Sequence, residues 1–122
     1  MNKILVIDDD EMDLQLMNLL FTREGYAIVK TADGPQGVEL YKKVRPAFVF
    51  LDLGLPSMNG LDVLKEIKSF DGGAKILVIT GYGSQKTANE AMNSGAVGFI
   101  EKTWDIGYML GEIKTAIKAL AV

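Results

Sequence analysis

The chain has 122 residues, of which 48% are hydrophobic, and its formal net charge is −3. A chain of this length can bury one hydrophobic core, and no stretch rich in proline, glycine or serine divides it, so we expect a single domain over residues 1–122. Cysteine and histidine are absent from the sequence. Disulfides, zinc sites built on thiolate or imidazole, and general-base catalysis by histidine are therefore excluded.

Charge and hydropathy also restrict the partners of the chain. The acidic balance, with no cluster of lysine and arginine, argues against direct nucleic-acid binding by this domain. The longest apolar stretches are far shorter than a membrane span, and the first residues lead into an apolar run rather than a signal peptide. We expect a cytoplasmic protein that has no contact with a membrane.

Five short apolar runs are separated by longer stretches of helical spacing. Continuous apolar runs bounded by turn signals are typical of strands that are buried on both faces of a parallel sheet. In chain order, the expected strands are 3–7, 27–31, 47–51, 76–79 and 97–100.

Each expected strand is followed by an expected helix, in which apolar residues recur three and four positions apart. In chain order, these helices cover 12–23, a stretch from Asp33 to Arg45, a stretch after Gly60, a stretch from Ser84 to Ser94, and 106–120. The apolar stripe of the first helix is expected to consist of Leu16, Leu19 and Leu20, with Met12 and Phe21 nearby. That of the last is expected to consist of Ile106, Leu110, Ile113, Ile117 and Leu120. Strict alternation of strands and helices predicts an α/β fold, a doubly wound parallel sheet with helices on both faces.

Polar residues directly follow four of the expected strands: Asp8-Asp9-Asp10, Asp52, Thr80 and Glu101-Lys102. The carboxyl ends of parallel strands lie along one edge of the sheet, where open α/β sheets bind their ligands. Carboxylates suit Mg²⁺, while a hydroxyl and a lysine suit a phosphoryl group. The sequence therefore predicts a site for a divalent cation and a phosphoryl group. Asp10 is expected to cap the first helix.

Four motifs carry a family resemblance: Ile4–Asp10, Asp52–Gly60, Ile79–Tyr82 and Gly95–Lys102. In this order and spacing they resemble the receiver domains of bacterial two-component response regulators. The resemblance implies the flavodoxin-like (βα)5 fold with strand order 2-1-3-4-5. It also implies phosphorelay signalling, in which an aspartate accepts a phosphoryl group from a sensor histidine kinase or a phosphotransfer protein. Such a domain is not an enzyme, although it assists its own phosphorylation and dephosphorylation.

The resemblance assigns Asp52 as the phosphoacceptor. It implies Mg²⁺ bound directly by Asp9, Asp52 and the backbone carbonyl of Gly54, with Asp8 acting through a metal-bound water. A carboxylate can attack phosphorus only where the repulsion between two anions is relieved, which the metal and a lysine achieve.

Two further residues are assigned to the phosphoryl oxygens, Lys102 as the balancing cation and Thr80 as a hydroxyl donor. Gly81 leaves the pocket open. Thr80 and the aromatic Phe99 are expected to act as the conformational switch. The output surface implied by the family comprises the fourth helix, fifth strand and fifth helix. An output domain, an effector protein or a second copy in a phosphorylation-dependent homodimer are the alternatives for its partner.

One departure from the family pattern concerns the residue after the lysine. Receiver domains usually have a proline there in a cis bond, and this chain has Thr103. A cis bond before a residue other than proline costs about 2.5 to 4 kcal/mol, so a trans bond is expected. The departure leaves room for one rival, a pseudo-receiver that binds partners without being phosphorylated.

Two rivals from other classes fit less well. A phosphohydrolase of the haloacid dehalogenase type needs a second aspartate two residues after the nucleophile, and Gly54 occupies that position. A flavodoxin needs phosphate-binding donors after the first strand, where this chain has three aspartates that would repel the phosphate.

Overall fold

The computed structural model describes residues 2–55, 57–81, 85–103 and 105–120. Two residues of the sequence motifs, Pro56 and Tyr82, lie outside these ranges, as do Ser84 and Trp104. The prediction that Ser84 opens the fourth helix therefore falls outside the described residues.

Strands and helices alternate along the described part of the chain without exception. The strands are β1 (Lys3–Ile7), β2 (Ala27–Thr31), β3 (Phe48–Leu51), β4 (Ile76–Thr80) and β5 (Gly98–Glu101). The helices are α1 (Glu11–Arg23), α2 (Gly34–Val44), α3 (Gly60–Phe70), α4 (Gln85–Asn93) and α5 (Ile106–Leu120). Helix termini agree with the sequence signals, since the side chains of Asp10, Asp33 and Asn59 accept hydrogen bonds from the first turns of α1, α2 and α3.

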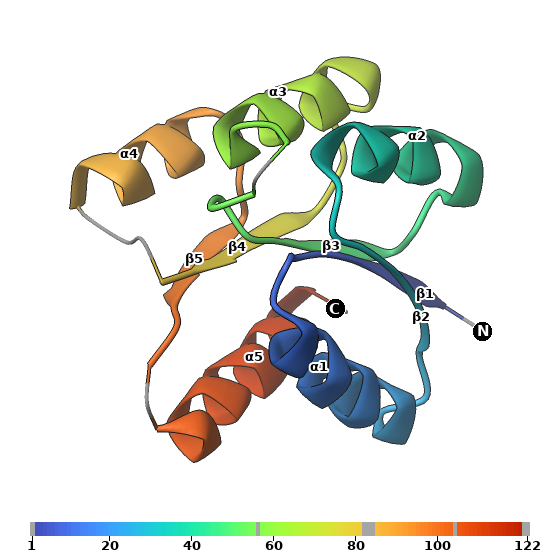
Figure 1. Ribbon diagram of the computed structural model, residues 1–122, viewed down its shortest axis with the longest axis vertical. Coiled ribbons are helices and arrows are strands. Elements are labelled where there is room, and N and C mark those ends of the chain that lie inside the picture. The colour runs from blue at the N-terminus through green and yellow to red at the C-terminus, as the bar shows by residue number, and fades with distance from the viewer. Residues whose placement is uncertain (1, 56, 82–84, 104, 121–122) are drawn as a thin grey trace.

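All strand pairs are parallel, and the order across the sheet is β2-β1-β3-β4-β5 (Figure 1). This is the flavodoxin-like topology that the sequence predicts, with the strand order 2-1-3-4-5. The chain reverses its direction of travel across the sheet between β1 and β3, which is the point where open α/β sheets form a crevice at the carboxyl ends of the strands.

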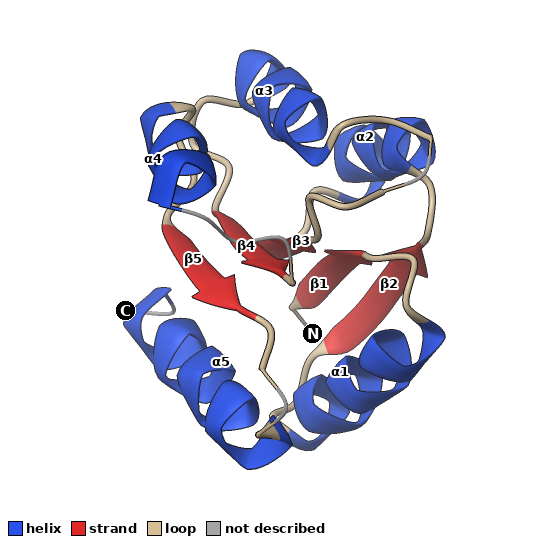
Figure 2. Ribbon diagram, turned by 60° about the vertical axis from the view of Figure 1, so that its left-hand side comes forward, coloured by secondary structure: helices blue, strands red, loops and turns tan. Residues whose placement is uncertain are grey.

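Helices cover both faces of the sheet, with α1 and α5 on one face and α2, α3 and α4 on the other (Figures 1 and 2). Strand residues alternate between the two cores: Ile4 and Val6 of β1 pack toward α1 and α5, whereas Leu5 and Ile7 pack toward the three-helix side. Because both faces are covered, the central strands are apolar throughout, which explains the continuous runs in the sequence.

The core face of α1 differs from the prediction. The buried residues are Leu14, Met17, Leu20 and Phe21. Leu16 is only half-buried and Leu19 is 56% exposed. Leu14, Met17 and Phe21 form a stripe at i, i+3 and i+7, and turning this stripe inward lets Phe21 stack on Phe50 of β3 at a centroid distance of 4.8 Å. Burial of the larger aromatic side chain decides the rotation of the helix.

The predicted core face of α5 is correct in its centre and wrong at its start. Ile113 and Ile117 are buried, as is Met109, but Ile106 is 45% exposed. Small shifts also occur in the strands, because Thr80 and Glu101 pair with each other and extend β4 and β5 by one residue. Among the described residues, no helix has the length and apolar character needed to cross a membrane.

Candidate functional site

Backbone hydrogen bonds hold the predicted site residues at the end of the sheet. The N–H of Asp8 donates to the carbonyl of Thr31 at 3.0 Å, that of Asp52 to Ile7 at 2.9 Å, and that of Lys102 to Thr80 at 2.9 Å. Each bond prolongs the ladder by one step beyond its strand. The side chains of Asp8, Asp52 and Lys102 are thus fixed relative to one another by the sheet rather than by flexible loops.

Three carboxylates surround the ammonium group of Lys102. Its Nζ lies 2.6 Å from Oδ2 of Asp13, 2.8 Å from Oδ2 of Asp52 and 3.0 Å from Oδ2 of Asp8. Asp8 and Asp52 are buried, and the Lys102 side chain is 18% exposed. The other oxygen of Asp52, Oδ1, accepts the backbone N–H of Gly54 at 3.0 Å. An ammonium group has three N–H donors; Lys102 donates a hydrogen bond to Asp52 and forms ion pairs with Asp8 and Asp13.

The surroundings separate the pKa values of the two buried aspartates. Burial raises the pKa of Asp8 to about 7, against hydrogen bonds from the Asp10 N–H and Lys102 that lower it. Burial also acts to raise the pKa of Asp52, but hydrogen bonds from Lys102, the Gly54 N–H and the Thr80 hydroxyl outweigh it and hold that pKa below its ordinary value. Asp52 is therefore ionised at neutral pH and able to act as a nucleophile or a ligand.

The pKa of Lys102 is raised above its usual value. Burial of the ammonium group opposes this shift, but the hydrogen bonds to Asp13 and Asp52 and the charge of Asp8 exceed the effect of burial. Lys102 is therefore a fixed positive charge at the centre of an acidic cluster.

The donor set fits a divalent cation that prefers oxygen. Carboxylate oxygens of Asp8, Asp9 and Asp52 lie within 4.8 Å of one another, a spacing that one ion can bridge. Asp9 is exposed, whereas the other two are buried, so the cluster opens to solvent on the Asp9 side. A cavity of about 600 Å³ adjoins it and is lined by Asp9, Asp10, Asp52, Gly54, Gly81 and Lys102. The space is sufficient for a metal with its waters and a phosphoryl group.

Glycines keep the entrance to this cavity free. A Cβ added to Gly81 would meet no atom within 4 Å, which agrees with the prediction that Gly81 leaves the pocket open. At Gly54 the backbone N–H already binds Asp52, so its contribution is the main chain.

The two predicted switch residues lie on the same face of the sheet. Phe99 pairs with Val78 in the register of β4 and β5, and Thr80 follows Val78 by two residues, so both point to the side of α4. Thr80 is fully buried, while Phe99 is half-buried and packs against the core on that side. The side chains of Thr80 and Phe99 therefore share one face of the sheet, as a coupled movement of the two would require.

Comparison with known proteins decides the family. Residues 4–114 match the response regulator receiver domain. The chain belongs to the response regulator receiver domain family. Receiver domains are signalling domains of two-component, phosphorelay-type systems, and they bind Mg²⁺ at an acidic pocket.

Similar proteins support this assignment over nearly the whole receiver domain. The chain is 34% identical over 116 residues to sporulation initiation phosphotransferase F of Bacillus subtilis, and the aligned region covers 95% of this chain and 90% of that protein. It is 37% identical over 101 residues to chemotaxis protein CheY of Thermotoga maritima, covering 82% and 84% of the two chains. The crystal structure of a CheX-CheY-BeF3-Mg²⁺ complex from Borrelia burgdorferi matches with a TM-score of 0.85 and 29% identity, covering 95% of this chain and 89% of that chain.

This receiver domain contains one charged contact that the sequence prediction did not include. Asp13 lies in the first turn of α1 and makes the shortest contact to Lys102. The only signal in the sequence is a fourth aspartate three residues after Asp10, at the helical spacing that places both in the same turn. The expected trans bond after Lys102 is confirmed, because the described residues contain no cis peptide bond.

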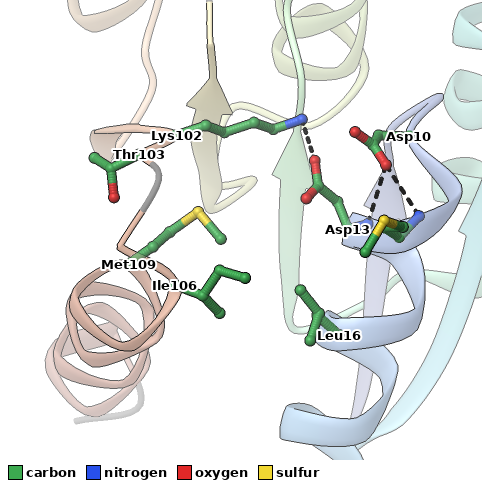
Figure 3. A pocket seen from close by; sticks show the side chains of 8 residues that line it. Asp10, Asp13, Leu16, Lys102, Thr103, Ile106 and Met109 are labelled. Atoms are coloured by element: carbon green, nitrogen blue, oxygen red, sulfur yellow. Dashed lines mark hydrogen bonds and ion pairs between the residues drawn. The ribbon is translucent and has the colours of Figure 1, made fainter.

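A second, more apolar cavity adjoins the site of this receiver domain. It has a volume of about 420 Å³ and lies between α1 and α5 (Figure 3). Figure 3 shows Leu16 on one wall facing Ile106 and Met109 on the other, with Lys102 reaching across the top toward Asp13. The full lining is Asp10, Met12, Asp13, Leu16, Lys102, Thr103, Ile106 and Met109. We refer to this cavity as the α1–α5 groove.

Proposed function

We propose that this receiver domain accepts a phosphoryl group on Asp52 from a phosphohistidine donor, in a reaction that requires Mg²⁺. One observation carries the proposal: an ionised Asp52 contacts the fixed cation Lys102 at 2.8 Å, beside a second and third carboxylate that are spaced to hold a metal. The ends of three different strands, β1, β3 and β5, supply these groups, and each is a residue that the family pattern assigns to this chemistry.

The residues divide the transfer step among them. A carboxylate oxygen of Asp52 attacks phosphorus, the new O–P bond forms as the P–N bond to the donor histidine breaks, and the imidazole leaves with the bonding electron pair. Lys102 binds a phosphoryl oxygen and offsets its negative charge, and the Thr80 hydroxyl donates to another. Asp8, Asp9, Asp52 and the Gly54 carbonyl would hold Mg²⁺, which supplies charge neutralisation for the transferring group.

Phosphorylation would then shift a population between two arrangements. In the active arrangement, Thr80 moves toward the phosphoryl group and Phe99 turns into the vacated space. Contacts of this kind, made in one arrangement only, are what biases such an equilibrium. The readout surface would be α4, β5 and α5, with an output domain, an effector or a second copy as its partner.

The α1–α5 groove is the proposed docking surface for the donor. It shares Asp10 and Lys102 with the cavity at Asp52, so a helix seated in the groove lies beside the phosphoacceptor. Its apolar walls suit one face of an amphipathic helix, the secondary structure that commonly docks in such grooves. The protein that carries the phosphohistidine is the proposed occupant of the groove.

Intact mass measured after incubation with acetyl phosphate tests the proposal directly. With Mg²⁺ we expect a gain of about 80 Da, one phosphoryl group. The gain should disappear in Asp52→Asn and on removal of Mg²⁺ by EDTA. Asp33→Asn is the matched control, because asparagine can also cap α2, and it should be phosphorylated like the native chain.

Failure of the native chain to gain mass, under conditions that phosphorylate another receiver domain, would contradict the proposal. It would favour the pseudo-receiver. In that case phosphorylation of a Thr103→Pro variant would identify the residue after Lys102 as the cause.

A further inference from the structure

We propose that Asp13 is a positioning residue that holds Lys102 in the resting domain and competes for it with the incoming phosphoryl group. The inference rests on the proposed phosphorylation of Asp52 and adds to it a residue that sets how readily the site accepts the group. It starts from the ion pair between α1 and the end of β5, the shortest of the three contacts to the ammonium group.

The ion pair is largely shielded from solvent. The side chains of Asp13 and Lys102 are 15% and 18% exposed, and their contact distance is 2.6 Å. Oδ2 of Asp13 is buried and has no hydrogen-bond partner among the described residues, so the ion pair with Lys102 is what compensates its charge. A carboxylate oxygen in this position is satisfied by Lys102 alone, so α1 has a strong electrostatic hold on the lysine.

The number of donors makes the contact competitive. Lys102 can donate three hydrogen bonds, and Asp8, Asp13 and Asp52 each have an oxygen within 3.0 Å of its Nζ. A phosphoryl oxygen that binds Lys102 must displace one of them or accept a shared proton. The chemistry assigned to the site uses Asp8 and Asp52, whereas Asp13 has no part in metal binding or transfer. Asp13 is therefore the partner whose removal frees the lysine without removing a reactive group.

Charge acts in the same direction as the donor count. Four carboxylates, Asp8, Asp9, Asp13 and Asp52, lie around a single lysine, and the fourth adds one negative charge where an anionic phosphoryl group must enter. Two like charges separated by a few ångströms at a partly buried site repel each other, although solvent and the protein screen the repulsion. Neutralising Asp13 should thus favour the phosphorylated state on both counts.

The test compares Asp13→Asn with the native chain at saturating Mg²⁺. The rate of phosphorylation by acetyl phosphate is followed by intact mass, and binding of BeF3⁻, a stable phosphoryl analogue, is followed by the fluorescence of the single tryptophan, Trp104. For Asp13→Asn we expect a phosphorylation rate about three- to tenfold higher and BeF3⁻ binding tighter by a similar factor. Asp13→Glu keeps the charge and should stay within about twofold of the native chain.

Asp10→Asn separates competition for Lys102 from a general effect of charge. It removes the same charge from the cap of the same helix turn and retains a capping side chain, but Asp10 makes no ion pair with Lys102. Its effect should be clearly smaller than that of Asp13→Asn. Equal effects of the two variants would overturn the specific role of Asp13 and leave only net charge.

The remaining outcomes are also decisive. A slower rate in Asp13→Asn would show that Asp13 aims Lys102 for the reaction, the opposite of competition, and unchanged rate and BeF3⁻ affinity would show that the ion pair is only structural. Thermal unfolding checks that each variant folds, and Asp13→Ser provides a second neutral variant at the same helix position. Absence of phosphorylation in the native chain would instead refute the proposed function, which keeps the two failures distinct.

Discussion

Residue 60 has no room for a side chain because the loop after Asp52 folds back onto it. A Cβ at Gly60 would lie 2.3 Å from the Cα of Leu53 and 2.9 Å from the carbonyl oxygen of Asp52. The N–H of Gly60 also donates to the carbonyl of Leu53 at 3.2 Å. Glycine at this position therefore sets the path of the chain immediately after Asp52.

Gly60→Ala should destabilise the domain and disturb Asp52 together. Because the obstructing atoms are backbone, the loop must shift, and we expect a loss of about 1 to 3 kcal/mol in the free energy of unfolding. Chemical denaturation measures this loss, and acetyl phosphate labelling should be slower. Gly72→Ala is the matched control, since its Cβ would meet no atom within 4 Å. Stability and labelling like those of the native chain would show that the loop adapts without cost.

Helix α1 combines two roles on two faces. Leu14, Met17 and Phe21 anchor it to the sheet, while Met12 and Leu16 line the α1–α5 groove. The sequence prediction placed Leu16 and Leu19 in the core because leucine is apolar wherever it lies on a helix. Leu16 instead lies on the wall of the groove that we propose as the docking face, and Ile106 at the start of α5 supplies the opposite wall.

Ile106→Glu should weaken phosphoryl transfer from a protein donor without affecting the chemistry of the site. Ile106 is 45% exposed, so a glutamate there fits the fold but places a charge in the apolar groove. We expect transfer from a phosphorylated histidine-containing protein to slow about tenfold or more, with acetyl phosphate labelling unchanged.

Leu19→Glu provides the comparison. Leu19 of α1 is 56% exposed but does not line the groove. Its substitution should therefore change neither the rate of transfer from the protein donor nor the rate of labelling by acetyl phosphate. Equal slowing by both substitutions, or none by Ile106→Glu, would place the docking surface elsewhere.

At the scale of the whole molecule, the sheet lies between two hydrophobic cores, and the site lies at the carboxyl ends of its strands. Buried Asp8 and Asp52 lie close together at this edge, and burial opposes ionisation of both. The raised pKa of Asp8 means that its ionised form costs free energy in the folded domain without a metal ion. A cation that binds the folded domain alone recovers part of that cost.

Mg²⁺ should therefore raise the midpoint of thermal unfolding. At a concentration about tenfold above its dissociation constant, the gain is about 1.4 kcal/mol. Differential scanning calorimetry with and without EDTA measures it. Asp9→Asn should abolish most of the effect by removing the exposed ligand, whereas Asp62→Asn in the first turn of α3 should retain it. An undiminished effect in Asp9→Asn would exclude the proposed ligand set.

The sequence by itself determined the element order, the parallel sheet and the gathering of polar residues at one edge of that sheet. Asp8, Asp52, Thr80 and Lys102 each lie at or directly after the end of an apolar run, and the covalent chain carries that adjacency into the fold. Once the runs are parallel strands of one sheet, their ends must share an edge. The resemblance to receiver domains added the roles of these residues, and the trans bond at Thr103 followed from the cost of the alternative.

Only the tertiary structure decided which face of α1 is buried and which residue faces Lys102. This helix has leucines on more than one of its faces, so the leucine pattern alone does not say which face is buried. Its rotation depended on the fit of Phe21 against Phe50, two residues from different parts of the chain. The same rotation directs Asp13 toward Lys102, which lies 89 positions later in the sequence. Contacts between remote elements depend on packing geometry, and no local pattern encodes them.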